Sequence, residues 1–354
     1  MIGIKWPSPM HAFCTLMICA AAAPSQAQGT EPIKGPHTVL EDGAHKIPGP
    51  HPGETIPMHL YYPAEGGPWP VIHFSHGAGA NKDMAPDLMR YWASHGYVVI
   101  VPTHEPDLTH SERPGLMRVI REFLQRRKLG PAMWQQRVDE LKTILDALDK
   151  GTLWPQAMQG RYDTRHIGLG GHSFGAYTAL LVGGAKLFGK DKVYDYRDDR
   201  IKAIVVISGP GRDKFGLTIT SFHSLTLPML VFAGSEDPGL PSEGGTAWRT
   251  QPYLFGPDGD KYLAYTKGAT HVTYVGGLVR TAGATKNPVL SAVRKVEKKI
   301  DPDLAESQAQ KIYALTKTTT LAFWNAYLKN DAKAKQTLHN LANQQNDTMK
   351  FEAK

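Results

Sequence analysis

Short runs of apolar residues alternate with amphipathic stretches along most of the chain. Residues 97–101 form a continuous run rich in β-branched residues, which is typical of a strand buried on both faces of a parallel sheet, and Ile-Lys-Ala-Ile-Val-Val-Ile at 201–207 predicts a further strand. After Pro131, apolar residues recur at spacings of three and four, which predicts a long amphipathic helix. This alternation predicts an α/β fold with a doubly wound, mostly parallel sheet and helices on both faces.

The remaining elements follow the same rhythm. Strands are predicted at 58–62, 71–75, 166–170, 228–233 and 261–265, the last of these being the final strand, and helices at 83–95, 174–186 and 304–328. We therefore expect one catalytic domain over residues 28–330 and a polar, fraying C-terminal tail over residues 331–354. Residues 105–130 interrupt the rhythm with a long, partly basic connection. Two interpretations stay open for it: a cap or insert beside a substrate cleft, or a solvated surface excursion.

The composition is that of a globular protein: the 354 residues are 41% hydrophobic and 21% charged, which argues against disorder and fibrous repeats. No apolar stretch reaches the ~18 residues that a membrane-spanning helix needs. The apolar run at 12–23, followed by the small residues Ser25 and Ala27, predicts a secretory signal peptide at residues 1–27. We therefore expect export to the periplasm or the medium.

Both cysteines, Cys14 and Cys19, lie within that predicted signal, so no disulfide and no thiol nucleophile is expected in the mature chain. The net charge of +7 is mild, and no zinc-finger spacing or dense basic block predicts a nucleic-acid partner. His73 and His76 lack a third ligand at metal-binding spacing, so no metal is expected. The oligomeric state stays open.

The clearest chemical motif is Gly-His-Ser-Phe-Gly at residues 171–175, between a predicted strand and a predicted helix. A sharp strand-to-helix turn strains the backbone of the serine and points its hydroxyl outward, and it requires small residues on either side. We therefore predict that Ser173 is a catalytic nucleophile.

An activated serine needs a histidine base. Three histidines follow Ser173 in the chain. We predict that His271 is the base, because it directly follows the strand predicted at 261–265, where a loop would return the imidazole over the sheet. His223 precedes the best carboxylate candidate, and His339 lies in the polar C-terminal region.

The base in turn needs an orienting carboxylate. Asp237 follows the strand predicted at 228–233, so it would lie at the same sheet edge as the other two residues. Asp213, after the preceding strand, is the alternative, and Glu236 is expected to face elsewhere.

The oxyanion that develops when a serine attacks a carbonyl requires preorganised N–H donors. The backbone N–H of Phe174, next to the nucleophile, is one candidate, and that of Ala78, in Ser-His-Gly-Ala-Gly at 75–79, is the other. His76 is expected to hold this loop by hydrogen bonding and not to act as a base. Tyr177, Trp248 and Tyr274 are candidates for lining a substrate pocket, with core packing as the alternative.

These residues give the chain a family resemblance. Leu-Tyr-Tyr-Pro-Ala at 60–64, Phe-Ser-His-Gly-Ala-Gly at 74–79, Ala-Ser-His-Gly-Tyr-Val-Val at 93–99 and Gly-His-Ser-Phe-Gly-Ala at 171–176 resemble the α/β-hydrolase superfamily. Within it, the chain is most similar to predicted dienelactone hydrolases and platelet-activating-factor acetylhydrolase-like esterases, with cutinase-type polyester hydrolases as cousins. The resemblance covers residues 55–275 and implies the α/β-hydrolase fold and a serine esterase without a cofactor.

Two positions distinguish this chain from those relatives. The acetylhydrolases carry their acid where Ser208 stands here, and Asp237 resembles the acid of dienelactone hydrolases and cutinases instead. Ser173 replaces the cysteine nucleophile of dienelactone hydrolases. We therefore expect a carboxylic ester hydrolase acting on a small-molecule, lipid or polymer ester. A lipase, a phospholipid acetyl-ester hydrolase, a polyester hydrolase and a catalytically silent binding protein are the alternatives.

Overall fold

The computed structural model describes residues 31–104, 131–154, 158–189, 191–238, 245–276, 306–344 and 346–354. The predicted signal peptide at 1–27 and the connection at 105–130 lie outside these residues.

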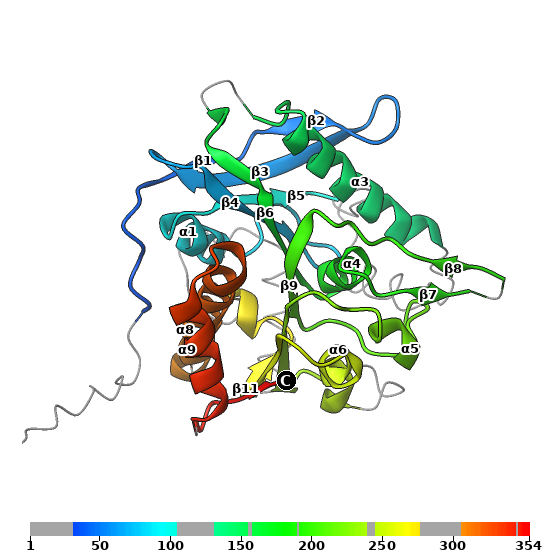
Figure 1. The fold of residues 1–354 in the computed structure, drawn as a ribbon, viewed down its shortest axis with the longest axis vertical. Coiled ribbons are helices and arrows are strands. Elements are labelled where there is room, and N and C mark those ends of the chain that lie inside the picture. The colour runs from blue at the N-terminus through cyan, green and yellow to red at the C-terminus, as the bar shows by residue number, and fades with distance from the viewer. Residues whose placement is uncertain are drawn as a thin grey trace, which may run out of the picture.

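A single large sheet forms the centre of the described structure (Figure 1). Its strand order is β1-β3-β5-β4-β6-β9-β10-β11-β12, and β2 pairs with β3. Neighbouring strands from β5 to β11 are parallel, whereas the pairs at the two edges are antiparallel. The strands are β1 (Val39–Asp42), β2 (Lys46–Pro48), β3 (Thr55–Pro63), β4 (Trp69–Ser75), β5 (Val98–Pro102), β6 (Tyr162–His172), β9 (Ile201–Ile207), β10 (Met229–Glu236), β11 (Lys261–Thr270) and β12 (Met349–Ala353).

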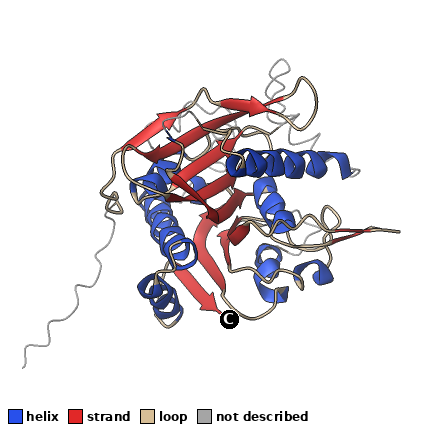
Figure 2. Ribbon diagram, turned by 45° about the horizontal axis from the view of Figure 1, so that its top comes forward, coloured by secondary structure: helices blue, strands red, loops and turns tan. Residues whose placement is uncertain are grey.

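Helices cover both faces of this sheet (Figures 1 and 2). One face is packed by α1 (Pro86–Ser94), α8 (Glu306–Leu328) and α9 (Ala332–Ala342), and the other by α3 (Pro131–Asp149) and α4 (Phe174–Val182). Shorter elements are α5 (Ile219–Phe222), α6 (Gln251–Phe255), η3 (Thr246–Thr250), η4 (Thr273–Val275) and the separate β7 (Leu187–Phe188) and β8 (Val193–Tyr194) pair. These layers confirm the predicted doubly wound α/β fold.

The two helical layers explain the continuous apolar runs. Successive side chains of a strand point to opposite faces, so Val71 packs into the cluster with α3 and α4, and Ile72 packs into the cluster with α1 and α8. Val206 and Ile207 divide in the same way at the end of β9. Because both faces of the sheet are buried, odd and even positions of these strands both face an apolar layer, where most polar side chains would lack partners.

The C-terminal segment differs from the prediction. Residues 331–354 form α9 and β12 instead of a fraying tail, and β12 pairs with β11, so β11 is not the last strand. The carboxylate of Asp331 caps α9 by accepting from the N–H groups of Lys333 and Ala334. Phe351 is buried and stacks on Tyr262 with ring centroids 5.8 Å apart. The alternating Met-Lys-Phe-Glu-Ala at 349–353 was the signal for this strand.

Helix α4 ends at Val182, four residues before the predicted end at 186. Gly183 and Gly184 follow it, and Gly184 has a φ of 116°, a conformation that side chains rarely adopt and that ends the helix. Among the described helices, none combines the length and apolar character required to cross a bilayer.

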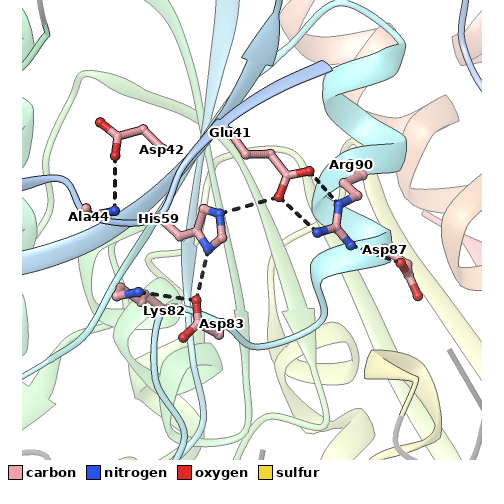
Figure 3. A network of polar contacts seen from close by, with 8 residues as sticks. All are labelled: Glu41, Asp42, Ala44, His59, Lys82, Asp83, Asp87 and Arg90. Atoms are coloured by element: carbon pink, nitrogen blue, oxygen red, sulfur yellow. Dashed lines mark hydrogen bonds and ion pairs between the residues drawn. The ribbon is translucent and has the colours of Figure 1, made fainter. Parts of the chain in front are cut away.

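A polar network attaches the N-terminal strands to α1 (Figure 3). The guanidinium of Arg90 donates to both carboxylate oxygens of Glu41, through Nε at 2.6 Å and Nη2 at 2.9 Å. His59 lies between Glu41, at 3.5 Å, and Asp83, at 2.9 Å. This network connects β1, β3 and α1.

Candidate active site

Ser173 occupies a strained turn between β6 and α4. Its φ of 55° and ψ of −115° lie outside the regions that residues with a side chain prefer. The N–H of Ser173 donates to the carbonyl of Ile207 at 2.9 Å, which ties the turn to the end of β9. A Cβ atom on Gly171 would overlap the Gly175 carbonyl, and one on Gly175 would overlap the Ser75 carbonyl. The glycines of the motif are therefore required by backbone contact.

The turn lies where the winding of the sheet reverses. Strand β4 lies between β5 and β6. After β4 the chain adds β5 on one side of it and then β6 on the other side. Ser75, at the end of β4, is in register with Gly171, at the end of β6. The loops after these two strands diverge, and open α/β sheets bind ligands at the crevice between such loops.

Three side chains from distant segments meet at this edge. Nε2 of His271 lies 2.9 Å from Oγ of Ser173. Nδ1 of His271 lies 3.0 Å from Oδ1 of Asp237. The side chain of Asp237 is only 1% exposed, whereas that of His271 is 32% exposed. This gradient leaves the imidazole accessible to a substrate and shields the carboxylate from water.

Asp237 is held by a residue that the sequence analysis missed. Nε of Arg249 lies 2.8 Å from Oδ1 of Asp237 in an ion pair and donates to the carbonyl of Asp237 at 3.0 Å, and Nη1 donates to the carbonyl of Ser208 at 2.7 Å. Burial alone would raise the pKa of the Asp237 carboxyl, but attraction to His271 and Arg249 outweighs it and lowers that pKa. Asp237 is therefore ionised at neutral pH. No local motif identifies Arg249.

His172 was also missed, although it belongs to the nucleophile motif. Its Nε2 lies 2.6 Å from the carbonyl of His271, and the ring is buried. Burial and repulsion from His271 lower the pKa of His172 to about 3, so the ring is neutral and Nε2–H is the donor. His172 therefore fixes the backbone of the histidine that faces Ser173.

The two predicted oxyanion donors lie on adjoining segments. Phe174 begins α4, and the N–H groups of the first helical turn have no acceptor within the helix. Ala78 belongs to the loop after β4. A Cβ atom on Gly77 would lie 3.3 Å from Cβ of Ser173, so this loop packs directly against the nucleophile turn.

The rejected candidates lie elsewhere. Asp213 has a side chain that is 79% exposed and pairs with Arg212 at 3.4 Å, so it does not join the three residues. Glu236 is exposed and hydrogen-bonds Ser235. His339 lies on α9, where its ring packs against Tyr262.

The aromatic candidates for a substrate pocket pack in the interior. Tyr177 and Tyr274 are fully buried, and the Tyr177 hydroxyl donates to the carbonyl of Phe215 at 2.6 Å. Nε1 of Trp248 donates to the carbonyl of Arg212. These contacts favour core packing over pocket lining. In the part of the chain that is described, no group of three or more acidic, histidine or cysteine side chains is arranged to hold a metal.

The sheet order, the nucleophile turn and the covering helices define the α/β-hydrolase fold, as the sequence predicted. A family model described as Chlorophyllase matches residues 38–187. The matched region contains the loop at 75–79 and the turn at Ser173 but ends before Asp237 and His271. It spans less than half of the chain, so it supports the superfamily and a hydrolase function without assigning a branch. No curated protein matches the chain.

Proposed function

We propose that this protein is a serine hydrolase that cleaves carboxylic esters through an acyl-enzyme. The observation that carries the proposal is the hydrogen-bonded series from Ser173 through His271 to the buried carboxylate of Asp237. The chlorophyllase match supports ester hydrolysis independently, because it covers the nucleophile turn.

In the proposed mechanism, Nε2 of His271 takes the hydroxyl proton of Ser173 as Oγ attacks the ester carbonyl. Asp237 accepts a hydrogen bond from Nδ1–H of His271, which fixes the tautomer whose Nε2 is unprotonated. The carboxylate also stabilises the imidazolium that forms. The same proton then passes from Nε2 to the leaving alcohol. Water attacks the acyl-enzyme by the same proton transfers in reverse, which releases the acid and restores Ser173.

The tetrahedral intermediate carries its negative charge on the former carbonyl oxygen. We propose that the N–H groups of Ala78 and Phe174 bind this oxygen. The N-terminus of α4 adds a favourable dipole at the same place. Loss of one such donor typically lowers kcat by about 10²- to 10³-fold.

For the substrate we propose carboxylic esters as a class and not one particular ester. Esters of small acids, lipid esters, phospholipid acetyl esters and polyesters all present the same carbonyl to Ser173. The chlorophyllase match adds chlorophyll esters as a specific second candidate. Export is proposed from the apolar run at 12–23 and its small-residue ending at Ala27.

The deciding experiment compares wild type, Ser173→Ala and Ser224→Ala on p-nitrophenyl esters from acetate to palmitate, with chlorophyll as a further substrate. Ser224 is the control serine: its hydroxyl donates to the carbonyl of Gly184, past the C-terminal end of α4, whereas Ser173 precedes the N-terminal end. We expect Ser173→Ala to abolish turnover and Ser224→Ala to retain it. A fluorophosphonate should label the Ser173 peptide of the wild type and of Ser224→Ala, and should not label Ser173→Ala.

The acyl-chain optimum then separates an esterase from a lipase, and turnover of chlorophyll would favour the second candidate. Unchanged turnover in Ser173→Ala would refute the nucleophile assignment. Absence of turnover and of fluorophosphonate labelling in the wild type would favour the binding-protein alternative.

A further inference from the structure

A second serine–histidine–carboxylate series is buried behind the candidate active site. Nε2 of His104, just after β5, lies 2.8 Å from Oγ of Ser75, at the end of β4. Nδ1 of His104 lies 2.7 Å from Oε2 of Glu140, on α3. All three side chains are buried, so the series is closed to an ester substrate and needs another explanation.

The protonation states in this cluster are determined by burial. Burial and the nearby positive charge of Arg137 lower the pKa of His104 well below its ordinary value, so the ring is neutral. A neutral ring next to a carboxylate carries its proton on Nδ1 and donates it to Glu140. Nε2 is then an acceptor, and the hydroxyl of Ser75 donates to it.

The backbone of His104 extends the cluster to His76. The N–H of His104 donates to Nε2 of His76 at 3.2 Å, so Nε2 is an acceptor and Nδ1 carries the proton. Burial and Arg137 lower the pKa of His76 as well, which keeps this ring neutral. Its Nδ1 then donates to the carbonyl of Gly77 at 2.7 Å.

This last contact orients the N–H that the proposed mechanism requires. The Gly77 carbonyl and the Ala78 N–H belong to one planar trans peptide unit, in which the two groups point in opposite directions. The carbonyl is held by His76 and by the N–H of Ala80 at 3.2 Å. Holding the carbonyl toward His76 therefore turns the Ala78 N–H away from it.

The peptide unit between His76 and Gly77 is held by a residue of α3, the helix that also carries Glu140. Nη1 of Arg137 donates to the carbonyl of His76 at 2.7 Å, and its guanidinium lies 4.7 Å from the ring centroid of Phe174. Arg137 thus contacts both the loop that bears Ala78 and the side chain of the residue that bears the other proposed donor.

We propose that His76, anchored by His104 and Glu140, and Arg137 are positioning residues that hold the loop at 75–79 in the conformation needed for an oxyanion hole. This inference rests on the proposed function. It makes α3 a support of the active site although none of its residues was predicted to be functional.

The test compares two substitutions of His76, to Asn and to Gln, whose side-chain amides differ by one methylene in their distance from the backbone. His76→Asn puts its amide nitrogen near the place of Nδ1, so it retains a donor to the Gly77 carbonyl. His76→Gln puts its amide near the place of Nε2, so it retains the contact with the N–H of His104 but loses that donor. We expect His76→Gln to lower kcat by about 10- to 100-fold at nearly constant KM, and His76→Asn to stay within a few-fold of wild type.

Two further measurements separate positioning from stability. A trifluoromethyl ketone that forms a tetrahedral adduct should lose affinity by the same factor as kcat, because it uses the same donors. Amide hydrogen exchange over residues 75–79 should be faster in His76→Gln than in His76→Asn. Thr143→Ala, also on α3, is the control and should change none of these quantities.

Wild-type kcat and exchange in His76→Gln, or a larger loss in His76→Asn, would overturn the inference. Glu140→Met removes the partner of His104 but leaves the His76 donor, so it should lower kcat less than His76→Gln does; if it does not fold, the His76 pair still decides. Should the wild type cleave no ester while loop exchange follows the expected order, the proposed function fails and the positioning network stands.

Discussion

Arg249 and the buried Asp237 form an ion pair, with Nε of the largely buried guanidinium 2.8 Å from Oδ1 of the carboxylate. The same oxygen accepts from Nδ1 of His271 at 3.0 Å. One carboxylate oxygen therefore joins the proposed catalytic histidine to a residue that carries no motif of its own. Arg249 also donates to the carbonyls of Asp237 and Ser208, so it connects the ends of β9 and β10.

Arg249→Leu should therefore reduce both stability and catalysis. Removing one partner of a buried ion pair typically costs about 3–5 kcal/mol, because the remaining charge stays buried. We expect a loss of unfolding free energy of that order in urea and a fall of at least about tenfold in kcat/KM. Arg212→Leu, which breaks the exposed pair with Asp213, is the matched control and should cost under about 1 kcal/mol. Equal effects of the two substitutions would contradict this role.

Gly175→Ala tests the nucleophile turn. A Cβ atom there would overlap the carbonyl of Ser75, which is backbone and cannot rotate away. We expect a loss of about 1–3 kcal/mol in unfolding free energy and a larger proportional loss of ester turnover, since Ser173 and the loop at 75–79 must both shift. In the control Gly43→Ala, the three nearest atoms would be ring atoms of the His59 side chain at 3.2–3.4 Å, and none of them is backbone. Full activity of Gly175→Ala would show that the turn tolerates this contact.

Stability should fall below neutral pH because four buried histidines are held neutral. Burial lowers the pKa of His73 and His172 to about 3, and those of His76 and His104 also lie well below the ordinary value. In the window between these folded values and the unfolded value of about 6.5, the unfolded chain binds more protons. Stability is therefore complete above about pH 6.5 and is lost as the pH falls, by up to about 1.4 kcal/mol per pH unit for each histidine.

Urea denaturation between about pH 6.5 and pH 5, where carboxylates remain largely ionised, isolates this effect. His73→Leu removes one of these titrating rings, so the change of unfolding free energy with pH should be smaller by the contribution of one proton. The ring nitrogens of His73 have no hydrogen-bond partner in the described structure, so this substitution breaks no hydrogen bond there. A flat profile in the wild type, or an unchanged slope in His73→Leu, would argue against neutral buried rings.

Phe351→Ala probes the C-terminal strand. The ring is buried against Tyr262 at the edge of the sheet, and truncating a buried aromatic typically costs about 3–5 kcal/mol. Lys350→Ala, at the neighbouring and exposed position of β12, should change the unfolding free energy by less than about 0.5 kcal/mol. Similar stabilities for the two variants would show that β12 is not part of the cooperative fold.

The sequence by itself determined the features that depend on local pattern. Runs rich in β-branched residues predicted β5 and β9, because a strand covered on both faces is built mostly from apolar side chains. The glycines at 171 and 175 predicted the turn at Ser173, because only small residues fit there. His271 and Asp237 were predicted to be the base and its carboxylate because each follows a strand. In the structure, the His271 ring lies at hydrogen-bond distance from both the Asp237 carboxylate and the Ser173 hydroxyl.

Only the tertiary structure decided the residues that support this site. Arg249, His172 and the series of Ser75, His104 and Glu140 act through contacts between segments far apart in the chain, for which no spacing or periodicity is diagnostic. Each is polar and is buried or, for Arg249, largely buried, and its role follows from the partner that satisfies it. Local pattern places a side chain at the end of a strand, but packing selects which buried hydrogen bonds form, and those bonds orient the reactive groups.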